Sequence, residues 1–252
     1  MAERPIFGSA PESSELVKEV FLPLKWHPGF AQSQKEKNIE ALHAAAREQG
    51  FSPLLEISSK SKSERGRHMS AFYMMVPTKQ YGRIKLELAF QGSKVFERGG
   101  PFTDLYCKGD KEIGEAKRDP RLKESGPLVG FCFEGIEFPL EPKSVFYDWL
   151  YCSFLSEYRD WAVKLYEYAG FSDIEFNPYR SINCQARSAA LFLSLMKLQV
   201  LDEALQSPSD FVGVLLRSGY RPQLRSEDFA PQHLFVESRD SGDRPATPPV
   251  SA

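Results

Sequence analysis

The order of apolar and polar residues predicts short strands and helices that follow one another along the chain. Residues 17–26 have the apolar and aromatic content of a strand, which Pro23 confines to an edge or a bend. A helix is expected over residues 30–49, with Gly50 as its stop. Three residues lie on its apolar stripe: Ile39, Leu42 and Ala46.

The middle of the chain predicts a unit of loop, strand, turn, strand and helix. Apolar runs at residues 51–57 and 72–76 flank a polar loop, and a turn at 77–82 precedes a second strand. The helix that follows is expected from about Leu86 to Phe96. Four of its residues have the spacing of a single helix face: Glu87, Phe90, Gln91 and Lys94. That face either lines a site or is the wetted side of an amphipathic helix.

The second half of the chain predicts further helices and one hairpin. Residues 108–125 read as a charged surface excursion, and residues 128–140 as a hairpin around Glu134 and Gly135. Ser144 is a candidate N-cap for a long aromatic helix, and a last helix is expected at residues 210–218. The expected fold class is α+β, mainly α with a few short strands, in a single domain.

The domain organisation follows from composition. Residues 1–15 are rich in small residues and proline and are expected to be a flexible N-terminus, and residues 239–252 a disordered tail. Residues 16–238 would form the one folded domain. With 252 residues, of which 42% are hydrophobic, this domain can bury a sizeable core.

Charge and hydropathy exclude several classes of protein. A formal net charge of -2 argues against a protein that coats nucleic acid electrostatically, so any contact with nucleic acid would be local. No apolar run is long enough to span a membrane, and the first residues lack an export signal. We therefore expect a cytoplasmic protein. The four cysteines and four histidines lack the spacing of metal ligands, so no metal site and no cofactor are expected.

A polar cluster marks the start of one helix in the second half. Ser181 is its candidate cap, and Asn183, Gln185 and Arg187 follow. The amides and dipole of such a terminus attract phosphate groups, so this is a candidate phosphate site. A capped core helix with polar residues in its first turn explains the same pattern.

Several motifs together resemble the NADAR superfamily, which is associated with NAD and ADP-ribose chemistry. The family pattern is a loop lysine, an SNF-like triplet and then SEHxFQxxK. The matching positions here are Lys60, the triplet Ser70, Ala71 and Phe72, and the helix residues Glu87, Phe90, Gln91 and Lys94. Here the triplet reads SAF and the helix begins LEL, so this branch retains Glu87 but does not require the Asn of SNF or the Ser and His of SEH.

The resemblance is closest to the NADAR antitoxins that are paired with DarT-type DNA ADP-ribosyltransferase toxins. It covers roughly residues 17–215 in five blocks: KWHPGFAQSQK, SSKS, AFQGSKVFERGGPFTDLY, EPKSVFYDWLY and DIEFNPYRSINCQARSAALF. It implies an enzyme that removes ADP-ribose from guanine bases of DNA and so reverses the toxin's modification. Its substrate would be ADP-ribosylated DNA, its product ADP-ribose and its functional partner the toxin, with no membrane involved.

There are two candidate catalytic residues, one from the chemistry of the reaction and one from the resemblance. Cleavage of an N-glycosidic bond needs a group near the anomeric carbon and a proton for the departing base, and the Glu87 carboxyl suits either task. The resemblance implies that Lys60 attacks the anomeric carbon and holds the opened sugar as a Schiff base. Lys62, two residues away, is the rival for that role.

The remaining candidates would bind substrate. Polar residues would contact ribose or phosphate, and rings would stack on the base, although helix aromatics such as Trp149 and Tyr151 also suit a core. Hydrogen bonding within the loop that contains DIEFNP is a competing explanation for its polar residues. The candidates are Ser70, Phe72, Phe90, Gln91, Lys94, Asp104, Trp149, Asp173, Asn177, Asn183 and Gln185.

Two other functions fit the same residues. One is an antitoxin without catalysis that binds ADP-ribose or sequesters the toxin, which the mild net charge favours. The other is an N-glycosidase that acts on intermediates of the riboflavin pathway, as other members of the superfamily do.

Overall fold

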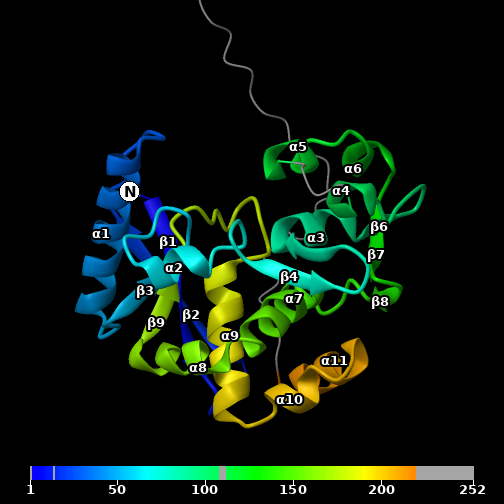
Figure 1. Ribbon diagram of the computed structural model, residues 1–252. Coiled ribbons are helices and arrows are strands. Elements are labelled where there is room, and N and C mark those ends of the chain that lie inside the picture. The colour runs from blue at the N-terminus through cyan, green and yellow to red at the C-terminus, as the bar shows by residue number, and fades with distance from the viewer. Residues whose placement is uncertain (1, 14, 108–111, 220–252) are drawn as a thin grey trace, which may run out of the picture.

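The computed structural model describes residues 2–13, 15–107 and 112–219. A four-stranded sheet with helix α1 lies on one side of the molecule, and α3 to α6 with a three-stranded sheet lie on the other (Figure 1). Helices α7 and α9 run between these two groups. The expected disordered tail, residues 239–252, is outside the described residues.

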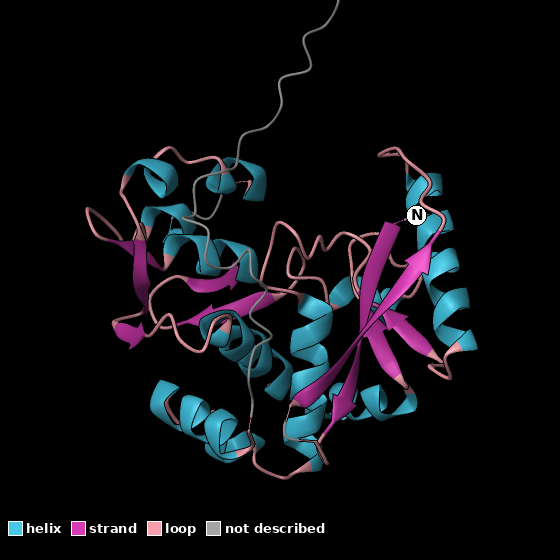
Figure 2. Ribbon diagram, turned by 180° about the vertical axis from the view of Figure 1, so that it is seen from behind, coloured by secondary structure: helices cyan, strands magenta, loops and turns pink. Residues whose placement is uncertain are grey.

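The four-stranded sheet has the order β2-β1-β9-β3. Its long strands are β1 (Ala2–Ala10) and β2 (Leu16–Leu24), which pair antiparallel and lie side by side in Figure 2. Short β9 (Gly170–Ser172) pairs antiparallel with β1 and parallel with β3 (Leu54–Glu56).

The strand β1 corrects the prediction of a flexible N-terminus for residues 2–10. The small and polar residues of this segment gave no signal of a strand. In the structure, β1 pairs with a strand on each side, and its Ile6 and Phe7 are fully buried. The prediction for β2 is confirmed, because this strand with Pro23 lies at the edge of the sheet.

Helices cover both faces of this sheet, α1 on one side and α9 on the other (Figures 1 and 2). Helix α1 (Gln32–Glu48) packs its predicted stripe of Ile39, Leu42 and Ala46 on Ile6 and Leu22 of the sheet. The helix ends before Gly50, whose φ of +84° is available to glycine without strain.

The central unit has the predicted order but a shorter helix. It consists of α2 (Glu64–His68), the hairpin of β4 (Met75–Thr78) and β5 (Gly82–Lys85), and α3 (Leu86–Gly92). The expected helix to Phe96 is wrong in its second half, since β6 (Lys94–Phe96) already pairs with β7. Strand pairing in the tertiary structure overrides the helical spacing there.

Three short helices precede the predicted hairpin, one just before the charged excursion and two within it. These are α4 (Asp104–Cys107), α5 (Ile113–Lys117) and α6 (Arg121–Glu124). The hairpin of β7 (Leu128–Phe133) and β8 (Ile136–Phe138) is confirmed, with Glu134 and Gly135 both at positive φ.

The last third is helical. It contains α7 (Val145–Ser156), α8 (Arg159–Ala162), the 3₁₀ turn η1 (Val163–Glu167), α9 (Gln185–Lys197), α10 (Leu201–Ala204) and α11 (Pro208–Arg217). Helix α9 begins after Cys184 and not at Ser181, so the predicted cap is wrong; the Ser181 hydroxyl bonds the Asn183 carbonyl instead.

The α+β class is confirmed. One large cluster of buried side chains joins α3, α7, α9 and the two smaller sheets, and a second lies between α1 and the main sheet. Within the described part of the chain, no helix combines the length and the apolar character that crossing a membrane requires.

Candidate active site

The first residue group of the site lies on α3. Glu87 is 7% exposed as a whole residue, and its Oε1 accepts a hydrogen bond of 2.9 Å from Gln91. The same oxygen lies 3.0 Å from the Lys117 ammonium of α5. Lys94 donates to Gln91 Oε1 at 2.8 Å, so it remains with this group although it belongs to β6.

Burial makes Lys94 an unusual lysine. Desolvation lowers its pKa from 10.5 to about 8, with a smaller lowering from Lys117 and an opposing contribution from Glu87. Its ammonium also lies 5.1 Å from the centre of the Phe90 ring. Lys94 and Glu87 are therefore largely shielded from water, and the partly exposed Lys117 lies beside them.

Aromatic rings surround this group. Phe90 packs edge-to-face on Tyr147 of α7 with ring centres 5.3 Å apart. Burial raises the pKa of Tyr147, and the nearby carboxylates of Glu87 and Asp173 raise it further. Tyr147 therefore lies within electrostatic reach of both carboxylates. Phe72 is 40% exposed, and the Lys117 ammonium lies 5.1 Å from its ring centre.

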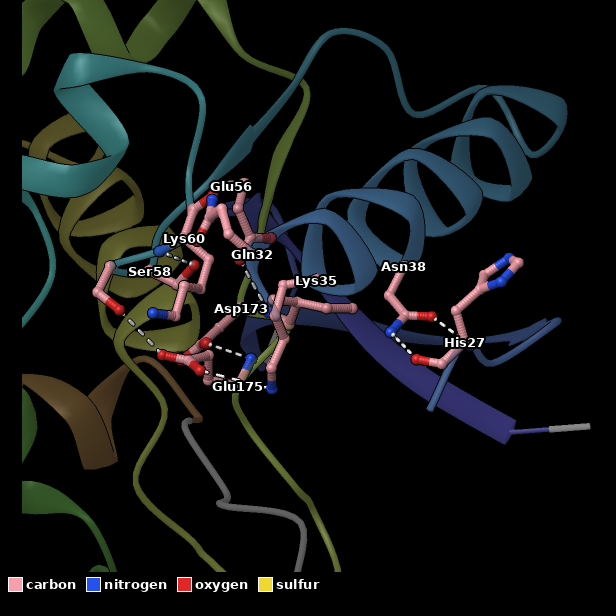
Figure 3. Close-up of polar contacts among 11 residues, drawn as sticks. His27, Gln32, Lys35, Asn38, Glu56, Ser58, Lys60, Asp173 and Glu175 are labelled. Atoms are coloured by element: carbon pink, nitrogen blue, oxygen red, sulfur yellow. Dashed lines mark hydrogen bonds and ion pairs between the residues drawn. The ribbon is translucent and has the colours of Figure 1, made fainter. Parts of the chain in front are cut away.

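The loop after β3 presents Lys60 (Figure 3). The Lys60 amide donates to Ser58 Oγ at 3.2 Å, and the Lys60 carbonyl accepts from Gln32 of α1 at 3.3 Å. Ser59 donates to Glu175 at 3.1 Å, and Glu175 lies 3.5 Å from the Lys35 ammonium. The loop is thus fastened to α1 and to the segment after β9.

The two rival lysines differ in their surroundings. Within the described ranges, no hydrogen bond or ion pair engages the half-buried Lys60 ammonium. Lys62 is 60% exposed and pairs with Glu40 at 2.6 Å, an interaction that raises its pKa. Of these two lysines, Lys60 is the one whose amine has no partner within the described ranges.

Gln185 connects the segments that carry the sequence motifs. Its Oε1 accepts from the Ala71 amide and its Nε2 donates to the Ile57 carbonyl, both at 2.8 Å. Burial raises the pKa of Asp173, and a further hydrogen bond from Gln185 partly opposes that rise. The buried amide at the start of α9 thus joins the Lys60 loop, the SAF triplet and the residues after β9.

Two carboxyl groups lie next to this junction, Asp173 and Glu56. Both are buried, and desolvation raises the pKa of each. Their mutual repulsion raises that of Asp173 further. Asp173 also accepts from the Glu175 amide at 3.0 Å.

Other predicted residues are engaged elsewhere. Asp104 binds Arg121 through both carboxylate oxygens, at 3.1 and 2.7 Å. Asn177 accepts from the Tyr179 amide at 3.0 Å, a local turn of the kind that competes with ligand binding. Ser70, the first residue of the SAF triplet, is fully buried, and Trp149 packs on Phe138 with its Nε1 unpartnered within the described ranges.

At the candidate phosphate site at the start of α9, the positively charged Arg187 is already paired with a carboxylate. Arg187 lies 3.4 Å from Asp148, and Ser188 donates to the same carboxylate at 2.6 Å. Asn183 lies outside the helix, and its carbonyl accepts from Ser181. These contacts agree with the alternative of a core helix with polar residues in its first turn.

Sequence reasoning missed four residues of this arrangement: Glu56, Lys117, Tyr147 and Gln32. Lys117 comes from a charged excursion whose spacing carries no signal, and Tyr147 from an aromatic helix that reads as core. Glu56 alone had a usable signal, because it is an acid inside the apolar run 51–57.

Two comparisons, one with protein-family models and one with curated proteins, bear on the family of this chain. A family model described as the DarT1-associated NADAR antitoxin matches residues 2–223. A search of curated proteins found no match to the chain.

Proposed function

Because the chain belongs to the family of DarT1-associated NADAR antitoxins, we propose that it is a hydrolase that removes ADP-ribose from guanine bases of DNA. Its antitoxin role would then be the repair of the toxin's product. The observation that carries this proposal is the half-buried Lys60 amine, which has no partner within the described ranges. Gln185 links the Lys60 loop to the SAF triplet, and three further hydrogen bonds hold the loop in place.

Glu87 is the proposed general acid and base. A buried carboxyl group that keeps polar partners can transfer a proton without leaving its place. The hydrogen bond from Gln91 and the ion pair with Lys117 both involve the Oε1 atom of Glu87. The carboxyl group would protonate the departing guanine nitrogen and afterwards accept a proton from the attacking water.

Lys60 is the proposed nucleophile. As a neutral amine it attacks the anomeric carbon of the ribose, a C–N bond to the lysine forms, and the C–N bond to guanine breaks. The lysine nitrogen then loses a proton, and the ribose ring oxygen leaves the anomeric carbon and takes a proton, which gives a Schiff base. Water adds to its carbon, the lysine amine departs, and ADP-ribose is released.

Mass spectrometry of an ADP-ribosylated guanine oligonucleotide tests the proposal. Wild-type protein at one hundredth of the substrate concentration should release all ADP-ribose, while Glu87→Gln and Lys60→Ala release at least about a hundredfold less. Borohydride should trap a protein adduct only where Lys60 is present. Lys62→Ala is the matched control and should keep both turnover and trapping.

The other outcomes identify the alternatives. Full turnover by both Glu87→Gln and Lys60→Ala contradicts the assigned chemistry. Release only at equal concentrations of protein and substrate indicates sequestration. Faster cleavage of riboflavin-pathway intermediates than of modified DNA indicates a small-molecule N-glycosidase.

A further inference from the structure

Glu56 is a buried acid that the proposed chemistry does not use. It is the last residue of β3 and is 3% exposed. Its Oε2 accepts a hydrogen bond from Ser172 at 2.5 Å, and its Oε1 accepts one from the Ile174 amide at 2.9 Å. A hydrogen bond from Ser58 also helps to lower its pKa against the larger effect of burial. A buried carboxyl group with this many partners has a definite orientation.

These partners belong to two different segments, the loop after β3 and the end of β9 with the residues that follow it. Ser58 accepts the Lys60 amide hydrogen at 3.2 Å, so it links Glu56 to the loop of the reactive lysine. Ser172 and Ile174 stand on either side of Asp173. A single carboxyl group therefore contacts both segments, which are more than a hundred residues apart in the sequence.

We propose that Glu56 is a positioning residue, whose carboxyl group fixes the Lys60 loop relative to the Asp173 segment. This inference rests on the proposed function for the role of Lys60, but not for the hydrogen-bond arrangement itself. Displacement of an attacking group by about 1 Å costs roughly a hundredfold in rate, so a fixed loop has a direct catalytic effect.

The arrangement continues outward to His43 on α1. His43 Nε2 lies 2.9 Å from Ser172 Oγ. The Ser172 hydroxyl has one hydrogen, which it donates to Glu56, so the Nε2 atom must carry the hydrogen of its own contact. Burial and the nearby Arg47 lower the pKa of His43 to about 4, which keeps the ring neutral at pH 7. The ring is therefore the Nε2–H tautomer.

The His43 end of this series of hydrogen bonds faces a cavity. His43 and Glu56 both line a cavity of about 480 Å³ between α1 and β3, whose wall also includes Arg47, Glu40 and Lys62. Asp173 and Glu175 lie within electrostatic reach of Glu56. Glu40, another acid of the cavity wall, is exposed and pairs with Lys62 at 2.6 Å.

Steady-state kinetics test the positioning role. Glu56→Gln should lower kcat by about 10- to 100-fold and leave KM within about threefold, because only the geometry of attack changes. Ser58→Ala should act in the same direction, and it carries the test if Glu56→Gln fails to fold. The control Glu40→Gln removes an acid from the same cavity and should leave both constants unchanged. Unchanged kcat in both Glu56→Gln and Ser58→Ala would overturn the proposal.

NMR spectroscopy tests the arrangement without any substrate. In Glu56→Gln the amide oxygen stays on Ile174 and the amide NH₂ donates to Ser172, so Ser172 must donate to His43. The His43 ring should change from the Nε2–H to the Nδ1–H tautomer, and the backbone resonances of Lys60 and Glu175 should shift together. An unchanged tautomer with shifts confined to β3 contradicts the inference, even if the wild-type protein proves to have no hydrolase activity.

Discussion

The Lys117 ammonium lies 3.0 Å from the Glu87 carboxylate and joins two segments that the sequence keeps 30 positions apart. The Glu87 side chain is 10% exposed and that of Lys117 43%. A residue of a surface excursion thus completes the polar group on α3. The same ammonium lies over Phe72 of the SAF triplet.

Loss of this ion pair should slow the reaction moderately. A partly exposed pair is worth about 1 kcal/mol, so Lys117→Gln should lower kcat/KM roughly fivefold. Lys117→Arg keeps the charge and should retain most of the rate. Release of ADP-ribose under single-turnover conditions measures both. Lys37→Gln, an exposed lysine on α1, is the control; equal rates for Lys117→Gln and wild type would show that the pair is not used.

Replacement of Lys94 should stabilise the protein. Lowering of its pKa from 10.5 to about 8 corresponds to about 3 kcal/mol of unfavourable burial of the ammonium. Lys94→Met removes that charge but leaves Gln91 Oε1 without its donor, so a net gain of about 1–2 kcal/mol is expected at pH 7.

The pH dependence of unfolding supplies a second measurement for Lys94. Between pH 8 and 10.5 the folded protein binds fewer protons at this site than the unfolded chain, so the wild-type stability should rise with pH there. Urea unfolding of Lys94→Met should lack that rise. A loss of stability at pH 7 would mean that the packing of Lys94 outweighs its charge.

Gln185 should be essential for folding stability. Gln185→Ala removes the partners of the buried Ala71 amide and Ile57 carbonyl, which should lower the free energy of unfolding by about 2–4 kcal/mol. Gln185→Glu still accepts from Ala71 but cannot donate to Ile57, and should also destabilise. Gln206→Ala, at an exposed hydrogen bond, should change stability by less than about 0.5 kcal/mol. Wild-type stability of Gln185→Ala would contradict its role as the link between loops.

His43 should make the protein sensitive to acid. Its pKa falls from 6.5 to about 4 on folding, so its contribution is complete above pH 6.5 and is lost as pH falls through 4. That contribution amounts to about 3 kcal/mol. His43→Gln keeps a donor for Ser172 and does not titrate. The difference in stability between the two proteins should therefore shift by this amount from pH 7 to pH 4, and a constant difference would exclude His43 as the source.

Local patterns in the sequence predicted the elements that surround the site. The edge strand with Pro23, the stripe on α1 and the hairpin at Glu134 follow from periodicity and turn residues, which act over a few positions. The sequence also marked Glu87, Gln91 and Lys94 as one group, and the structure brings them together through hydrogen bonds of 2.9 and 2.8 Å. Even so, the group forms across the end of α3 and not along a continuous helix.

The resemblance in the sequence and the match to the family model agree on what kind of protein this is. The tertiary structure decided which polar residues are engaged and which are open. Asp104 pairs with Arg121, and Lys62 with Glu40, while the Lys60 amine meets no partner within the described ranges. It also decided that residues 2–10 form a strand between two others. Such pairings depend on contacts between distant segments, and no local spacing in the chain encodes them.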